Sequence, residues 1–204
     1  MDTCKKCRRA GEKLFLKGER CELPKCAIVK RNYAPGVHGG KKQKRSSEYG
    51  TQLAVKQRLK HAYGLREQQL KNYFSKVKSK TGDVGELLLQ KLEMRLDNLV
   101  YRSGVARSRR EARQMVNHGM FLVQGKEVDI PSYGVRVGDA IQIKESKKKP
   151  ALQERLKDAA KKTPPAAWIN VDHQKGEIKI MAVPSGQEIG EISDIGMVVE
   201  YYSR

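Results

Sequence analysis

All four cysteines of the 204-residue chain lie in one short stretch near its start, CKKCRRAGEKLFLKGERCELPKC. They form a C-x2-C pair and a C-x4-C pair separated by thirteen residues. Four thiolates in two close pairs can surround Zn2+ tetrahedrally and leave no position for water, which is the chemistry of a structural site. An iron–sulfur cluster and free thiols remain alternatives. We favour one structural zinc ion held by Cys4, Cys7, Cys21 and Cys26.

A second group of residues could bind phosphate. In SRREARQMVNHG (108–119), Ser108 and Glu111 form a capping box, so a helix should begin at Arg109 and end at Gly119. The helix N-terminus adds backbone N–H donors and a favourable dipole. We expect four polar residues on the side away from the core: Arg109, Arg110, Arg113 and Asn117. A solvated arginine face is the alternative.

Catalytic patterns are weak. The triplet Arg95-Leu96-Asp97 resembles one that carries the catalytic Asp in some RNA pseudouridine synthases, but here it lies within a leucine-striped helix pattern. We therefore predict an ion pair between Arg95 and Asp97 on a helix surface. The four histidines have no ligand or triad spacing, and no Gly-rich phosphate loop precedes a helix. These observations predict a protein that is not an enzyme.

The charge of the chain indicates the kind of partner. Lys and Arg number 42 against 23 Asp and Glu, a net charge of +19. Residues 1–64 hold 17 cations and 5 acids, a net of +12, whereas residues 168–204 hold 3 and 6, a net of −3. Nucleic acid fits this excess better than an acidic membrane surface, because Lys and Arg neutralise phosphates directly. The acidic tail is expected to pack on the protein itself or on a protein partner. No apolar run approaches the roughly 18 residues of a membrane span, and there is no secretory signal, so we expect a cytosolic protein.

The elements that position these residues follow from periodicity. Amphipathic helical patterns occupy residues 48–64, 65–82 and 85–104, and a short helix is expected over 151–162. The period changes to two at FLVQGKEVD, where Gln124-Gly125 predicts a hairpin turn. Further strands are expected within 135–143, 168–186 and 197–204. Tyr49, Tyr63, Tyr73 and Tyr101 could stack on bases, but at helical spacing we favour core or rim positions.

These patterns predict an α+β protein with four parts. They are a zinc-pinned basic arm (1–45), a helical body (46–92), a unit of two helices and a small sheet (93–145), and a linker helix followed by a β-rich C-terminal segment that packs on the rest (146–204).

Longer stretches resemble a known family. RLDNLVYRSGVARSRREARQMVNHGMFLVQGKEVDIPSYGVRVGDAI resembles the S-four RNA-binding module, which also occurs in some pseudouridine synthases and tyrosyl-tRNA synthetases. LFLKGERC, PGVHG, QLAVKQRLKHAYGL and VEYYSR match landmarks of the bacterial small-subunit ribosomal protein S-four family, in its zinc-cysteine-containing type. Members usually have several residues, including a Tyr and a Gly-Pro, before the first cysteine position, whereas this sequence has three.

The resemblance implies a structural constituent of the small ribosomal subunit, located in the bacterial cytoplasm. Such a protein binds small-subunit ribosomal RNA at a helix junction in the 5′ domain and nucleates assembly of the subunit body. It contacts ribosomal protein S-five, lies near the mRNA entry channel and influences translational accuracy. Neither a membrane nor DNA is an expected partner. A pseudouridine synthase with the same module is disfavoured, because the about 60 residues after residue 145 cannot house a typical catalytic domain.

The residues expected to contact RNA are cations and polar groups of the arm, of the first long helix and of the capped helix. They are Lys5, Lys6, Arg8, Arg9, Lys41, Lys42, Lys44, Arg45, Lys56, Arg58, Lys60, Arg109, Arg110, Arg113, Gln114, Asn117 and His118.

Overall fold

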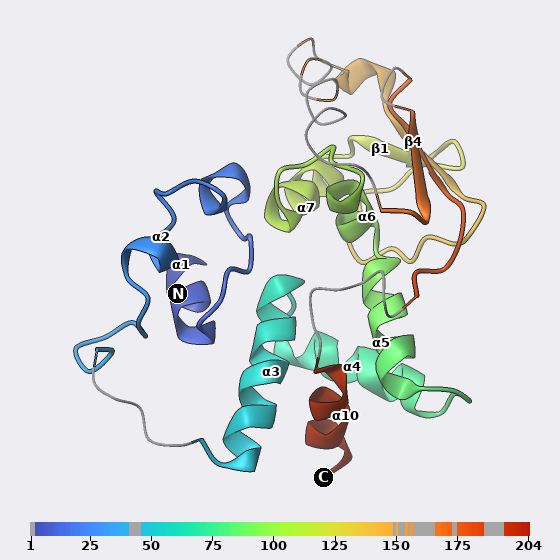
Figure 1. Cartoon of the computed structure of the whole chain (residues 1–204). Coiled ribbons are helices and arrows are strands. Elements are labelled where there is room, and N and C mark those ends of the chain that lie inside the picture. Colours follow the sequence, from blue (N-terminus) through green and yellow to red (C-terminus); the bar gives the residue numbers. More distant parts are fainter. Residues whose placement is uncertain are drawn as a thin grey trace. The chain divides into compact units, whose positions relative to one another are not determined.

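The computed structural model describes residues 3–40, 46–148, 150, 154, 156, 166–172, 175–185 and 194–204. The chain divides into two compact units (Figure 1). Unit 1 comprises residues 1–88 and 191–204, and unit 2 comprises residues 89–190. Unit 1 is helical and unit 2 combines helices with an antiparallel sheet, so the predicted α+β class is confirmed. Most of the helix expected over 151–162 lies outside the described residues.

Unit 1 begins with short elements and continues with longer helices. The arm contains α1 (Thr3–Ala10), the 3-10 helix η1 (Gly18–Cys21) and α2 (Ala27–Lys30). The helices α3 (Glu48–Ala62), α4 (Glu67–Lys78) and α5 (Val84–Glu93) follow, and the last of these continues into unit 2. Helix α3 begins where the sequence predicts, because the Ser47 hydroxyl accepts a hydrogen bond from the Gly50 backbone N–H at 3.2 Å.

The C-terminal residues form helix α10 (Ile195–Ser203), so the strand expected over 197–204 is wrong. The β-branched and aromatic residues of VVEYY favour a strand locally. A helix instead places Val198, Tyr201 and Tyr202 on one side at i, i+3 and i+4. Val198 is fully buried, and the Tyr202 ring lies 5.1 Å from the Phe74 ring of α4. Packing on α3 and α4 therefore outweighs the local preference.

The single helix expected over 85–104 is two helices, α5 and α6 (Leu96–Arg102). Arg95 separates them in an extended conformation, with φ −76° and ψ 140°. The first backbone N–H groups of α6 are satisfied by a later loop, since Leu96 donates to the Tyr133 carbonyl and Asp97 to the Pro131 carbonyl. The leucine pattern continues across the break because both helices bury an apolar side. Periodicity alone therefore hides the break.

Within the described part of unit 2, the sheet has five antiparallel strands in the order β2-β1-β3-β5-β4. Their bounds are β1 (Phe121–Val123), β2 (Lys126–Glu127), β3 (Ala140–Ile143), β4 (Ile169–Asp172) and β5 (Glu177–Ile180). The predicted hairpin is confirmed: Gln124 and Gly125 both have positive φ, at 50° and 75°, as a tight two-residue turn requires. Val137 lies outside a strand and is exposed, whereas Ile141 and Ile143 are buried as expected.

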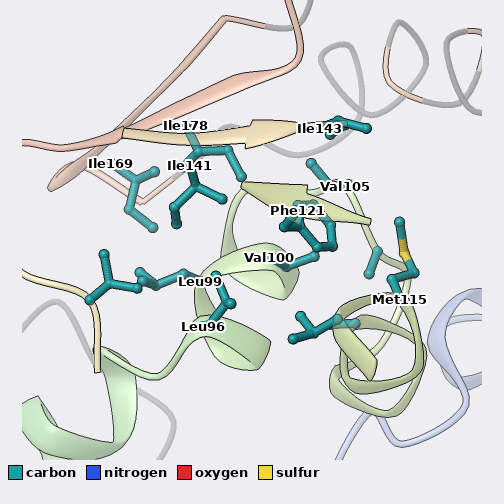
Figure 2. Close-up of a cluster of buried hydrophobic side chains, with 14 of the residues drawn as sticks. Leu96, Leu99, Val100, Val105, Met115, Phe121, Ile141, Ile143, Ile169 and Ile178 are labelled. Carbon is teal, nitrogen blue, oxygen red and sulfur yellow. The ribbon is translucent and has the colours of Figure 1, made fainter. Parts of the chain in front are cut away.

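Two helices and the sheet share one hydrophobic core (Figure 2). Helix α6 and helix α7 (Arg109–Asn117) contribute apolar side chains that meet those of β1 and β3. Strands β4 and β5, which follow residue 145, complete the same sheet and add Ile169 and Ile178 to the core. The core that supports helix α7 therefore includes residues that precede residue 145 and residues that follow it.

Candidate nucleic-acid interface

Helix α7 presents a polar face at the surface of unit 2. It begins at Arg109 as predicted, because the Ser108 hydroxyl accepts from the Glu111 backbone N–H at 3.2 Å. Ala112, Met115 and Val116 are buried in the core. The opposite face carries five of the predicted RNA-binding residues at spacings of three, four, seven and eight: Arg110, Arg113, Gln114, Asn117 and His118. Arg113 is half-buried and the other four are exposed. We call these five residues the α7 face.

Arg109 does not belong to the α7 face. Its Nε donates to Asn98 Oδ1 at 2.7 Å, and its guanidinium stacks 4.6 Å from the centre of the Tyr101 ring. Only 9% of its side chain is exposed. The guanidinium therefore ties the start of α7 to α6, which the spacing of the arginines could not reveal.

A buried carboxylate organises this junction. Glu93, the last residue of α5, has a side chain that is 1% exposed. It accepts two hydrogen bonds from Arg102, each at 2.9 Å, and one from Asn98 Nδ2 at 2.7 Å. Asn98 in turn accepts from Arg109. This Glu93 network connects α5, α6 and α7, so it fixes the orientation of the α7 face.

The predicted ion pair between Arg95 and Asp97 exists, but its predicted surface position is wrong. Arg95 donates from Nε and Nη2 to the two carboxylate oxygens at 3.0 and 2.7 Å. The side chains are only 1% and 6% exposed. The extended backbone at Arg95 places both groups inside unit 2. Asp97 therefore forms a buried structural ion pair with Arg95 and is not exposed to a substrate.

None of the four cysteines of the arm forms a disulfide, and Cys7, Cys21 and Cys26 are buried. Burial raises the pKa of the Cys7 and Cys21 thiols, while a backbone hydrogen bond to each lowers it. Electrostatic interaction with Cys4 and Cys26 raises both pKa values further. Among the described residues, no three His, Cys, Asp or Glu side chains are arranged so that they could hold a metal ion.

The basic residues of the arm differ in their exposure to solvent. Lys5 and Arg9 are exposed, whereas Lys6 and Arg8 are half-buried. Arg8 donates to backbone carbonyls of the same arm. The run predicted at Lys41, Lys42, Lys44 and Arg45 lies outside the described residues.

The three cations predicted on α3 all have acidic partners within unit 1. Lys56 is 3% exposed, lies 2.6 Å from Glu67 and sits over the Tyr201 ring. Lys60 lies 2.8 Å from the same carboxylate. Arg58 approaches two acids far away in the sequence, Glu12 at 3.2 Å and Asp194 at 3.4 Å. We therefore leave Lys56 out of the proposed RNA contacts.

Glu67 joins α3, α4 and α10. Partial burial by itself would raise the pKa of this carboxyl, but hydrogen bonds from Lys56, Lys60 and Tyr202 outweigh it and lower the pKa to about 2. The same carboxylate, after burial, raises the pKa of Tyr202. Tyr63 is buried, Tyr49 packs on Tyr201, and Tyr101 lies under Arg109, so these tyrosines occupy the core and rim positions that we favoured.

Comparisons with known proteins identify the family. Residues 2–93 match the family described as ribosomal protein S4/S9 N-terminal domain, and residues 94–141 match the S4 domain. Small ribosomal subunit protein uS4 of Syntrophomonas wolfei is 48% identical over 99% of this chain and 97% of its own length. The protein of that name from Acetivibrio thermocellus is 50% identical over the same shares, 99% and 97%. The chain belongs to the uS4 family of small ribosomal subunit proteins.

The uS4 assignment confirms the resemblance seen in the sequence. Another relative, small ribosomal subunit protein uS4A of Alkaliphilus metalliredigens, is 49% identical over 99% of the chain. All of these relatives are named as ribosomal proteins, so they support the prediction that the uS4 chain is not an enzyme and give no support to a pseudouridine synthase. Within the part of the chain that the structure describes, no helix is both long and apolar enough to cross a membrane.

Proposed function

We propose that this chain is a structural constituent of the small ribosomal subunit that binds its RNA directly and nucleates assembly of the subunit body. The observation that carries the proposal is the α7 face, held on a rigid core by the Glu93 network. Polar and basic side chains at a capped helix start suit contact with the phosphates of folded RNA. Membership of the uS4 family and the net charge of +19 support the same partner.

Binding to matched nucleic acids tests this function. The full chain is titrated into a transcript of the 5′ domain of small-subunit ribosomal RNA and into duplex DNA of equal phosphate number. We expect the folded RNA to bind at least about 10³-fold more tightly, as specific sites do compared with non-specific ones. Equal affinity for the two would show general attraction to polyanions and would refute a specific ribosomal role.

The α7 face gives a prediction at residue level. Arg110→Ala combined with Arg113→Ala should weaken binding to the 5′-domain RNA by about 1–3 kcal/mol. The thermal midpoint should change little, because neither residue is buried. Filter binding measures the first effect and circular dichroism the second.

The matched control is Lys175→Ala with Lys179→Ala, which removes two positive charges elsewhere on unit 2. If the control weakened binding as much as the α7 pair, net charge and not the α7 face would account for the affinity. Arg109→Ala should behave differently and lower the stability, since its side chain is packed against α6.

We propose further that Cys4, Cys7, Cys21 and Cys26 bind one structural Zn2+, which would draw the four thiols closer together than they lie in the arrangement described above. The donor set supports this, because thiolates are the ligands that Zn2+ prefers in closed structural sites. Three of the four cysteines are 7% exposed. Burial and repulsion by neighbouring thiols raise the pKa of the Cys7 and Cys21 thiols, and a bound cation would reverse that effect. A metal would hold together an arm that contains few buried apolar side chains.

Elemental analysis of protein purified without a chelator should give close to one zinc per chain. Cys21→Ser, or chelation, should loosen the arm and leave the cores of both units folded. Affinity for RNA should then drop moderately, because the basic residues of the arm would have to become ordered on binding. Absence of zinc, or the presence of iron with visible absorbance, would contradict the assignment.

The resemblance suggests finer roles, which we propose here. They are contact with ribosomal protein S-five, a place near the mRNA entry channel, an influence on translational accuracy, and residence in the bacterial cytoplasm. The acidic balance of residues 168–204, a net of −3, supports a protein partner over RNA for that part of the chain. Cross-linking within assembled subunits tests the contact with S-five.

A further inference from the structure

The conformation of one short loop of the arm is fixed by side-chain contacts and by two glycines. The loop comprises residues 33–40, with the sequence YAPGVHGG. Arg8 of α1 fixes its start, because Nε donates to the Tyr33 carbonyl at 3.0 Å and Nη2 donates to the Ala34 carbonyl at 3.3 Å. The same guanidinium stacks on the Tyr33 ring, 4.7 Å from its centre. One side chain therefore holds both the backbone and the ring.

Two glycines close the loop. Gly36 has φ +110°, a conformation that residues with a side chain rarely adopt. The Gly39 backbone N–H donates to the Gly36 carbonyl at 3.1 Å. A Cβ atom at Gly39 would lie 1.7 Å from the Ala34 carbonyl oxygen, so only glycine fits there. The chain thus folds back tightly on the segment that Arg8 holds.

This preformed loop exposes apolar surface. Val37 at its tip is 96% exposed, and Tyr33 is 46% exposed although Arg8 covers one side of its ring. One exposed valine needs no explanation by itself. Here, however, an arginine and two glycines fix the loop that presents it, and such pre-organisation lowers the ordering cost of binding.

The surrounding charge indicates the kind of partner. Residues 23–47 contain seven Lys or Arg and no Asp or Glu. A protein surface would need to be strongly acidic to approach this segment, whereas a nucleic acid offers phosphates beside apolar base and ribose surfaces. Proteins that bind single-stranded nucleotides commonly combine a basic track with an aromatic ring on which a base stacks.

We propose that loop 33–40 is a preformed contact for an unpaired nucleotide of the ribosomal RNA, with a base stacked on Tyr33 and Val37 packed against the adjacent base or ribose. The inference rests on the proposed function and adds a contact that depends on stacking instead of charge. The ring of Tyr33 is the essential part, and its hydroxyl is not.

Three variants of the full chain test the loop against 5′-domain RNA. Tyr33→Ala should weaken binding about tenfold, as removal of one stacking side chain does. Tyr33→Phe should bind like the unchanged chain, because it keeps the ring. Val37→Ala should weaken binding about threefold. None of these changes removes a charge, so the slope of log affinity against log salt concentration should stay the same.

Ile130→Ala is the matched control, because Ile130 of unit 2 is 56% exposed and lies outside the basic segment. Circular dichroism of each variant checks folding. If Tyr33→Ala and Val37→Ala bound RNA as the unchanged chain does, the loop proposal would fail while the proposed function stood. If the unchanged chain did not bind the RNA, both would fail. Each variant is also tested for binding to phosphatidylglycerol vesicles. If Tyr33→Ala and Val37→Ala bound these vesicles less tightly than the unchanged chain but bound RNA equally well, the loop would be a membrane contact and the proposal would be refuted.

Discussion

Affinity for small-subunit ribosomal RNA should fall at least about 10³-fold when the salt concentration rises from 50 to 200 mM. Each neutralised phosphate releases counterions, and six contacts give a slope of about −5 in log affinity against log salt. The 17 cations among residues 1–64, together with Arg110 and Arg113 of the α7 face, provide enough partners for six phosphates even after Lys56 is set aside. Filter binding across a salt series measures the slope.

The α7 pair provides an internal check on this slope. Arg110→Ala with Arg113→Ala should reduce its magnitude by about two, one for each phosphate that the variant no longer neutralises. A nearly flat salt response of the unchanged chain would contradict a phosphate-based interface. A steep response that the α7 pair left unaltered would place the phosphate contacts elsewhere on the chain.

Replacement of Glu93 by Ala should lower the free energy of unfolding of unit 2 by about 3–5 kcal/mol. Removing one partner of a buried, hydrogen-bonded charge cluster leaves the other charges buried and unpaired. Arg102 would lose both of its bonds to the carboxylate, and Asn98 would lose one. The chain has a single tryptophan, Trp168, which is 3% exposed within unit 2, so its fluorescence during urea unfolding reports on this unit.

Glu127→Ala is the control for the Glu93 variant. Glu127 is also in unit 2 and forms an ion pair with Lys144, but its side chain is 51% exposed. Its replacement should cost under about 1 kcal/mol, as for other surface pairs. Equal losses from the two variants would show that the Glu93 network does not support the module. A folded Glu93 variant with unchanged RNA affinity would show that the network does not orient α7.

Local signals predicted several elements correctly. The Ser108 N-cap and the Gln124-Gly125 turn depend on residues within four positions of one another, so the sequence alone contains the necessary information. The other half of the predicted capping box differs, because the Glu111 carboxylate accepts from the Arg107 backbone N–H at 2.8 Å. The division of α7 into a buried and an exposed side follows in the same way from helical periodicity.

Partners distant in the sequence decided the features that were missed. The break at Arg95 depends on a loop about 35 residues later, whose carbonyls receive the N–H groups of α6. The C-terminal helix forms because Val198 and Tyr202 pack on α3 and α4. The pattern of charges could not separate Lys56, which faces Glu67, from the lysines left on the surface. Such contacts override local preference and are invisible to spacing rules.

Sedimentation with ribosomal subunits tests the central claim most directly. A tagged copy of the chain is expressed in a bacterium, and the lysate is separated on a sucrose gradient under conditions that dissociate ribosomes into subunits. We expect the tagged chain in the small-subunit peak, in a ratio approaching one copy per subunit when it replaces the resident protein. The Arg110→Ala, Arg113→Ala variant should shift towards the top of the gradient. Recovery of the unchanged chain only at the top, or with DNA or membranes, would contradict the account.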